Sequence, residues 1–497
     1  MSQPDPDLPG GEQPSLAEAL TRPGLFLRES LAGIVTALAL VPEVISFSFI
    51  SGVDPKSALV ASIMLCLVMS AIGGRPAMVT AAAGSIALVV GPMVQVHGPG
   101  YILPAVLLAG GLQILLGVTG TARLARFIPR SVMIGFVNAL GILIFLAQVP
   151  HVLGGSPAVW GLFALTVAIV LATPRITTAV PAPLVAIIAV TLLAVLGGLA
   201  VPTVGGEGDM APGLPGLTPL LVPPTLETLA IVWPSAVSIA LVGLLESILT
   251  AKLVDEITDT RSSKGRESWA LGVANILAGL WGGVAGCAMI GQTVVNVKIG
   301  RARTRLSTFV AGIAMLLLVT ILSGVMARIP IVALAAVMMI VAVSTLNWHS
   351  VAPATLRRMP LPETGVMLTT VALTVVTGNL AIGVGGGVLL AMVLFARRVA
   401  HVIAVRRSPS PDGQSVQYEI HGPLFFGSSN DLFEHFAYAA DPRHVTIDLS
   451  QSQIWDASSV AALDSIIERF RLHGSEVTLT GLDRRSSAFY DRLTGTV

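Results

Sequence analysis

The sequence predicts a polytopic α-helical membrane protein that ends in a small cytoplasmic α/β domain. Of its 497 residues, 54% are hydrophobic and only 11% are charged, whereas a soluble domain carries roughly 25% charged residues. The apolar residues form repeated runs, most of them long enough to cross about 30 Å of hydrocarbon. From about residue 416 the composition changes abruptly to that of a soluble domain.

Composition also excludes several classes of protein. The N-terminal tail, residues 1–26, is acidic and rich in proline and glycine. It lacks the basic start and apolar stretch of a cleavable signal peptide, so we expect a short cytoplasmic tail. Cys66 and Cys287 both lie in apolar segments and indicate neither a disulfide framework nor a metal cluster. The net charge of +1 does not indicate a nucleic-acid partner.

Hydropathy predicts fourteen spans within a membrane transport domain at residues 27–400. They lie near 31–50, 57–73, 80–95, 101–119, 131–149, 158–173, 182–200, 228–250, 267–283, 288–298, 303–326, 330–346, 362–378 and 380–396. With a cytoplasmic N-terminus, 21 Lys and Arg residues fall inside and two, Lys56 and Arg328, fall outside. Because one span more or fewer in the middle would destroy this separation, we expect fourteen spans and cytoplasmic termini.

The spans divide into two halves, about 27–200 and 228–400, joined by a loop (201–227) that contains no Lys or Arg. Seven is an odd number, so a structural repeat would be inverted. Inverted repeats with interrupted helices are a recurrent transporter architecture, with the substrate bound near the midplane.

The third span of each half is short and rich in small residues. The two segments read RPAMVTAAAGSIALVVGPM (75–93) and GGVAGCAMIGQTVVNV (282–297). If each starts a helix in mid-membrane, its free N–H groups and positive dipole end would form an anion site without a cationic side chain. The alternative is that the small residues serve only close helix packing.

Two carboxylates, Glu43 and Glu246, interrupt the first span of each half. An ionisable group at membrane depth costs at least ~2.5–3.5 kcal/mol and normally faces a bundle interior or a water-filled cavity. The pair therefore indicates a transporter, and the alternative is a hydrogen bond to a neighbouring helix. Burial and a nearby anion both favour a protonated carboxyl group, so anion binding and protonation would reinforce each other. Glu246 is the preferred proton carrier, and Glu43 is also a candidate to orient the substrate.

The C-terminal region alternates strand-like and helix-like segments and predicts a soluble α/β domain at residues 416–497, after a linker at 401–415. Its sequence contains no metal-ligand spacing, phosphate loop or nucleophile elbow. We therefore expect a regulatory or structural domain, and we expect no enzyme activity and no cofactor.

Several motifs together resemble the sulfate permease (SulP) anion transporter family in a bacterial-type form. In the membrane domain these are LAGIVTALALVPEVISFSFISGVDP, LVGLLESILTAKLVDEITD, GRESWALGVANILAGLWGG, TVVNVKIGRARTR and RIPIVALAAVMMIVA. The tail segments YEIHGPLFFGSS and TIDLSQSQIWDASSVAALDSI resemble a STAS domain. Purine and uracil permeases share the membrane architecture but lack such a tail.

The resemblance implies a uracil-permease-like fold of seven plus seven spans, with core and gate domains, an elevator-type motion and a homodimer in the inner (plasma) membrane. It also implies a small-anion site between the third and tenth spans, and a STAS domain that is a candidate to bind cytoplasmic regulatory proteins. Carried over by position, the residues around the substrate are Glu43, Phe47, Thr80, Ala81, Ala82, Ala83, Gly84, Gly291, Gln292 and Thr293, with Glu246 and Glu43 as the coupling groups.

Four departures from the family pattern in the membrane domain and one in the STAS domain matter. The signature after the first span reads PKSALVAS, and small residues replace the Gly-Pro of the third span. Gln292 stands where vertebrate relatives carry arginine, and Glu43 stands where a neutral glutamine is common. An ionised Glu43 would repel an anion, so these two changes favour proton-coupled uptake over chloride exchange. In the STAS domain, Ala457 occupies the phospho-acceptor position, which excludes phosphorylation at that residue.

Two other functions stay open from sequence. One is an uncoupled anion conductor or a chloride/bicarbonate exchanger, and the other is a nucleobase permease on the same architecture, which the STAS tail disfavours. A membrane anchor for a signalling module would not need fourteen spans with buried carboxylates. The sequence does not choose among sulfate, bicarbonate, chloride and dicarboxylates, and it leaves Na⁺ open as an alternative to H⁺.

Overall fold

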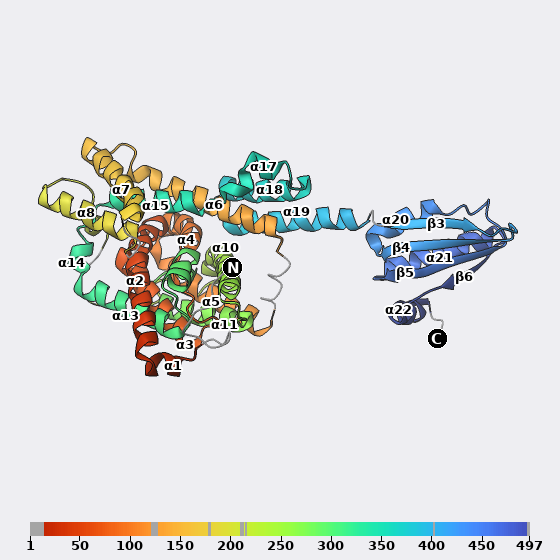
Figure 1. The fold of residues 1–497 in the computed structure, drawn as a ribbon, viewed down its shortest axis with the longest axis horizontal. Helices are drawn as coiled ribbons and strands as arrows, with labels where there is room; N and C mark the ends of the chain where they lie inside the picture. Colours follow the sequence, from red (N-terminus) through yellow and green to blue (C-terminus); the bar gives the residue numbers. More distant parts are fainter. Residues whose placement is uncertain are drawn as a thin grey trace. The chain divides into compact units, whose positions relative to one another are not determined.

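The computed structural model describes residues 14–120, 128–176, 180–208, 213, 216–400 and 403–494. Residues 1–13 of the predicted tail, 401–402 of the predicted linker and 495–497 of the predicted C-terminal domain lie outside this part. The chain forms two compact units, Met1–Val388 and Leu389–Val497, and Figure 1 labels many of their helices and strands.

A helix lies in each of the fourteen segments that the sequence predicts as spans. In the first half these are α2 (Pro23–Ser51), α3 (Pro55–Ile72), α4 (Gly84–His97), α5 (Ile102–Val118), α6 (Arg130–Gln148), α7 (Pro157–Ile176) and α8 (Ala182–Leu196). In the second half they are α10 (Leu226–Thr258), α11 (Lys264–Leu280), α12 (Ile290–Val294) continued by η4 (Val295–Ile299), α13 (Arg305–Ile321), α15 (Ile331–Thr345), α18 (Leu361–Thr377) and α19 (Leu380–Ala400). Short helices lie before and between them: α1 (Leu16–Thr21), η1 (Pro99–Tyr101), η3 (Val149–His151), α9 (Val204–Glu207), α14 (Ser323–Met326), α16 (Trp348–Val351) and α17 (Pro353–Leu356).

Length and composition support several of these helices as membrane spans. Within the described residues, seven are long and apolar enough to cross: Pro23–Ser51, Pro55–Ile72, Pro99–Val118, Arg130–His151, Pro157–Ile176, Leu226–Thr258 and Leu380–Val399. Five shorter apolar helices accompany them: Gly84–His97, Ala182–Leu196, Arg305–Ile321, Ile331–Thr345 and Leu361–Thr377. The number of fourteen crossings stays a prediction.

The two halves interlock in two groups of helices. In one group, α2, α3 and α5 pack against α10, α11 and α13 of the other half. In the second group, α6 and α7 pack against α15, and α6 also packs against α18. We call the first the core group, which also includes α4 and α12 packed against α2 and α10, and the second the gate group, which also includes α8 packed against α7. Contacts of α2 with α8 and α15, and of α4 with α6, join them.

Both short spans begin as strands rather than as helices. Strand β1 (Thr80–Ala82) pairs antiparallel with β2 (Gly286–Ala288), and only then do α4 and α12 begin. The strands approach closely because Gly286 has no side chain: a Cβ there would lie 2.2 Å from the carbonyl oxygen of Ala81. The sequence indicated the interruption of the two spans but not this pairing, which gives each extended segment backbone partners that hydrocarbon cannot supply.

Polar side chains from neighbouring helices satisfy the outer edges of this two-stranded sheet. Asn275 does so in both directions: its Oδ1 accepts from the Gly286 N–H (2.8 Å) and its Nδ2 donates to the Gly286 carbonyl (3.2 Å). Four more contacts come from α3 and α10: Ser62 Oγ with Ala82 N (3.0 Å), Cys66 Sγ with Thr80 O (3.1 Å), Ser247 Oγ with Ala288 N (3.1 Å) and Thr250 Oγ1 with Ala288 O (3.4 Å).

Two further buried carboxylates, which the sequence analysis did not single out, fasten loops at the ends of the core helices. Glu29 accepts hydrogen bonds from the backbone N–H of Arg303 (2.7 Å) and from the hydroxyl of Thr304 (2.9 Å), just before α13. Glu267 accepts from the N–H groups of Gly74 (2.7 Å) and Arg75 (3.0 Å), just before β1. Each carboxylate therefore ties one half of the chain to a loop of the other.

The C-terminal unit contains a mixed four-stranded sheet in the order β3-β4-β5-β6. Its elements are β3 (Ala404–Pro409), β4 (Ser415–Leu424), α20 (Phe426–Leu432), η5 (Phe433–His435), β5 (His444–Ile454), α21 (Ala457–Leu472), β6 (Glu476–Thr480) and α22 (Arg484–Thr494). Strand β3 is antiparallel to β4, and the other pairs are parallel. Figure 1 shows the strands side by side with helices packed around them.

The predicted linker at 401–415 is corrected by β3, which occupies its centre. The sequence signal was weak because β3 is an edge strand whose Arg406 and Arg407 are not buried, and charge on an edge strand discourages aggregation. Arg407 Nη2 pairs with Asp441 at 2.6 Å, and the Tyr418 hydroxyl donates to the same carboxylate. Burial, reinforced by Asp441, raises the pKa of Tyr418. These contacts make β3 part of the folded domain.

Replacing Asn275 by leucine should destabilise the protein markedly, because it leaves the N–H and C=O of Gly286 buried without partners. Each such group costs about 1–3 kcal/mol. The measurement is the thermal unfolding midpoint of the purified protein in detergent. Thr166→Val is the matched control, since Thr166 is equally buried but its hydroxyl bonds only the Leu162 carbonyl within its own helix. Equal midpoints for the two variants would contradict this account of the sheet.

Candidate functional site

Glu43 of α2 faces the first turn of α12. Its carboxylate lies within hydrogen-bonding reach of the Gln292 side chain. Gln292 is buried, whereas Glu43 is only half-buried and the neighbouring Gly291 is exposed. A charged side chain, an amide and exposed backbone therefore meet within the core group, where most residues are enclosed.

The starts of α4 and α12 also meet α2. A Cβ on Gly84 would lie 2.6 Å from the Phe47 ring, so the glycine lets that ring pack against the first turn of α4. A Cβ on Gly291 would meet nothing within 4 Å, so open space lies beside the first turn of α12. Neither helix has a side-chain N-cap. The positive end of each helix dipole is thus not occupied by a capping side chain of its own.

The structure brings five of the ten predicted substrate residues together beside the starts of α4 and α12, and it places the other five in or next to the two-stranded sheet. Glu43 meets Gln292, Phe47 meets Gly84, and Gly291 adjoins Gln292 at the open space. Residues Thr80, Ala81, Ala82 and Ala83 are buried in β1 and the turn after it. Thr293 Oγ1 accepts from the Val79 N–H (3.0 Å) and so joins the two interrupted spans.

Glu246 lies in a different set of contacts from Glu43. Its Oε2 accepts hydrogen bonds from Ser85 Oγ at the start of α4 and from Cys287 Sγ of β2. The residue is 6% exposed. The two carboxylates that the sequence pairs by position therefore have separate partners: Glu43 faces the open space, and Glu246 faces the sheet.

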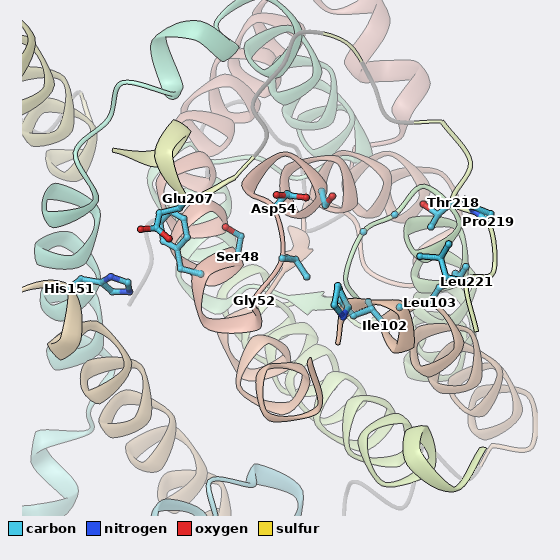
Figure 2. Close-up of a pocket in the computed structure, with 18 residues that line it drawn as sticks. Ser48, Gly52, Asp54, Ile102, Leu103, His151, Glu207, Thr218, Pro219 and Leu221 are labelled. Atoms are coloured by element: carbon cyan, nitrogen blue, oxygen red, sulfur yellow. The ribbon is translucent and has the colours of Figure 1, made fainter. Parts of the chain in front are cut away.

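A cavity of about 620 Å³ that the sequence analysis did not anticipate opens near the C-terminal end of α2 (Figure 2). Ser48, directly after Phe47, contributes to its wall, and so do the ionisable residues Asp54, His151 and Glu207. In Figure 2, Glu207 and His151 lie at one side and Thr218, Pro219 and Leu221 at the other. Asp54 and Thr218 lie between helices, and His151 and Glu207 end the short helices η3 and α9, so no periodic pattern in the sequence indicates that these residues line a cavity.

Among the residues that the structure describes, no cluster of His, Cys, Asp and Glu side chains could hold a metal ion. In the part of the chain that the structure covers, the candidate site therefore consists of two helix starts, an amide and carboxylates. Such a set suits a small anion and a proton, because backbone N–H groups at helix starts can bind an anion and a carboxyl group can carry a proton.

The chain matches two known families along its length. Residues 26–161 and 156–370 match the sulfate permease family, and residues 403–491 match the STAS domain. A Bacillus subtilis protein named as a sulfate transporter, YbaR, is 46% identical over 95% of this chain and 97% of its own length. The bicarbonate transporter BicA of Picosynechococcus is 23% identical over 88% of this chain and 85% of its own length.

Solved structures show the same fold. The murine Solute Carrier 26 family member A9 anion transporter superposes with a TM-score of 0.82 at 14% identity, covering 94% of this chain and 87% of that one. The transmembrane domain of a cyanobacterial BicA gives a TM-score of 0.65 at 21% identity, covering 74% and 97%. The predicted fold class is confirmed, apart from the span count. The chain belongs to the sulfate permease family, whose members are multi-pass membrane transporters and not enzymes, and it ends in a STAS domain.

Proposed function

We propose that this protein is a secondary active transporter that moves a small anion of the sulfate, bicarbonate or carboxylate/dicarboxylate class in symport with protons. Its relatives named for sulfate and bicarbonate support the anion class. The observation that carries the proposal is the contact of Glu43 with Gln292 beside the exposed Gly291, at the uncapped start of α12.

Charge accounts for the coupling. Two unit charges of like sign 4 Å apart repel by about 4 kcal/mol at an effective dielectric constant near 20. An anion at the start of α12 would be this close to Glu43, and Gln292 offers no positive charge to compensate. The anion therefore binds when Glu43 is protonated, and Glu246 carries a proton alongside it. Na⁺ in place of H⁺ is the alternative for the coupling ion.

Transport proceeds by an elevator-type alternating-access motion in which the core group moves against the gate group. The cavity near Ser48 and Glu207 is then an outer vestibule, because the connector at 201–227 contains no Lys or Arg and is expected outside. The same charge distribution supports a place in the inner membrane with both termini in the cytoplasm. We further propose a homodimer in which the STAS domain supports assembly or binds cytoplasmic regulatory proteins.

Purified protein in liposomes should take up one or more of labelled sulfate, bicarbonate, chloride and succinate, and an inward pH gradient should accelerate the uptake. A matched Na⁺ gradient at equal pH is the control. Uptake that requires Na⁺ and ignores pH would contradict proton coupling. Voltage-dependent anion current without any gradient dependence would instead support a channel-like protein, and uptake of uracil insensitive to these anions would support a nucleobase permease.

Glu43→Gln should make anion uptake less dependent on pH, because an amide cannot ionise and repel the substrate. We expect wild-type uptake to fall about tenfold or more between external pH 6 and pH 8, and uptake by the variant to fall severalfold less over the same range, because the remaining pH dependence is that of Glu246. Glu246→Gln should abolish proton movement with the anion, followed with a pH-sensitive dye inside the liposomes. Proton entry equal to that of the wild type would remove Glu246 from the mechanism.

Gly291→Ala and Gly84→Ala form a matched pair at the two helix starts. Gly291→Ala should leave the unfolding midpoint near that of the wild type, because its methyl group enters open space, and should raise KM severalfold by narrowing the site. Gly84→Ala should lower the midpoint, because its methyl group would overlap the Phe47 ring, and overpacking typically costs about 1–3 kcal/mol. Equal effects of the two variants on stability would refute the open space beside Gly291.

A further inference from the structure

Glu246 is held by two donors from elements that come from opposite halves of the chain. Ser85 lies in the first turn of α4 and Cys287 lies in β2, and both donate to the same oxygen, Oε2. The two donor atoms lie 3.8 Å from each other. All three side chains are enclosed: Ser85 is 1% exposed, Cys287 is not exposed and Glu246 is 6% exposed.

The chemistry of the two donors fixes the direction of these bonds. A carboxylate only accepts hydrogen bonds, and a thiol beside it stays neutral, since ionisation would place two negative charges together. Ser85 and Cys287 therefore both stabilise the ionised form of Glu246 through Oε2. Described residues provide no hydrogen bond to Oε1. That oxygen is the one left to take a proton.

Other ionisable groups do not compete for this carboxylate. Helix α5, which packs against α10, has no ionisable side chain, and α12 has none either. Helix α10 itself and the other elements packed against it contain further ionisable residues besides Glu246 and Cys287. These residues lie toward the ends of their elements, away from Glu246: His97, Glu227, Lys252, Asp255, Glu256, Lys264, Arg266, Glu267 and Lys298. Cys287 is the titratable group that faces Glu246.

We propose that Ser85 and Cys287 are positioning residues for Glu246: they hold Oε2, leave Oε1 for the proton, and so set the pH range in which transport operates. This inference rests on the proposed proton coupling. It assigns no contact with the anion to either residue. Because Ser85 belongs to the third span and Cys287 to the tenth, the proton-carrying group is held by both interrupted spans at once.

Cys287→Ala and Cys287→Ser separate the hydrogen bond from packing, since the two replacements differ by a single hydroxyl group. The readout is the external pH at which labelled sulfate uptake by liposomes is half-maximal, or labelled bicarbonate uptake if the anion panel identifies that substrate. Loss of one donor makes the ionised form less favourable, so Glu246 keeps its proton to a higher pH. We expect Cys287→Ala and Ser85→Ala to move the midpoint upward by about 0.5–1 pH unit, and Cys287→Ser to stay near the wild type.

Two controls keep this test separate from folding and from the proposed function. Cys66→Ala removes a buried thiol that contacts the Thr80 carbonyl and not Glu246, so it should leave the midpoint in place. In a Glu246→Gln background, Cys287→Ala should have no further effect on the pH profile. If Glu246→Gln abolishes proton entry but Ser85→Ala and Cys287→Ala keep the wild-type midpoint, the positioning role is wrong and the proposed function stands. If Glu246→Gln keeps proton entry, the proposed role of Glu246 falls, and the positioning role with it.

Discussion

The core of this protein depends on satisfying the backbone polar groups of two spans that stop being helical. In hydrocarbon each unpaired N–H or C=O group costs several kcal/mol, so non-helical backbone survives only where protein supplies its partners. Here β1 and β2 are partners for each other along one edge, and Ser62, Ser247 and Asn275 are among the side chains that complete the other edges. Ser62 of α3, Ser247 of α10 and Asn275 of α11 thus have a structural role within otherwise apolar helices.

The same pairing determines where the candidate site lies. Because β1 and β2 are antiparallel and only three residues long, α4 begins at one end of the sheet and α12 at the other, and α2 packs against both helices. Glu43 and Phe47 lie one helical turn apart on α2, so one residue meets Gln292 and the other meets Gly84. The position of the candidate site therefore follows from the way in which the two interrupted spans satisfy their backbone hydrogen bonds.

The sequence was sufficient to predict the helices and to single out the two carboxylates, because a long apolar run and a charge within it can be recognised without the structure. It was insufficient for β1 and β2, because TAA and GCA are too short to show alternation and their pairing joins residues about two hundred positions apart. The sequence did not distinguish Asn275 from any other polar residue within a span. Glu29 and Glu267 lie at helix ends, where a carboxylate is expected near water, and only the loops of the opposite half reveal their burial. Strand β3 was not predicted, because its exposed arginines do not show the apolar pattern of a buried strand.

The closed hydrogen-bond network also restricts how the site can change sides. Sliding β1 past β2 would break their ladder and the link from Thr293 to Val79, and sliding β2 against α11 would break both bonds of Asn275 to Gly286. Each buried group left unpaired would cost about 1–3 kcal/mol, and several would be lost together. By contrast, the core group meets the gate group mainly through apolar helix faces of α2, α8 and α15, which can exchange one set of contacts for another. The motion with the lower free-energy cost therefore moves the sheet, both helix starts and both carboxylates as one body. This favours an elevator-type motion over a rearrangement within the site.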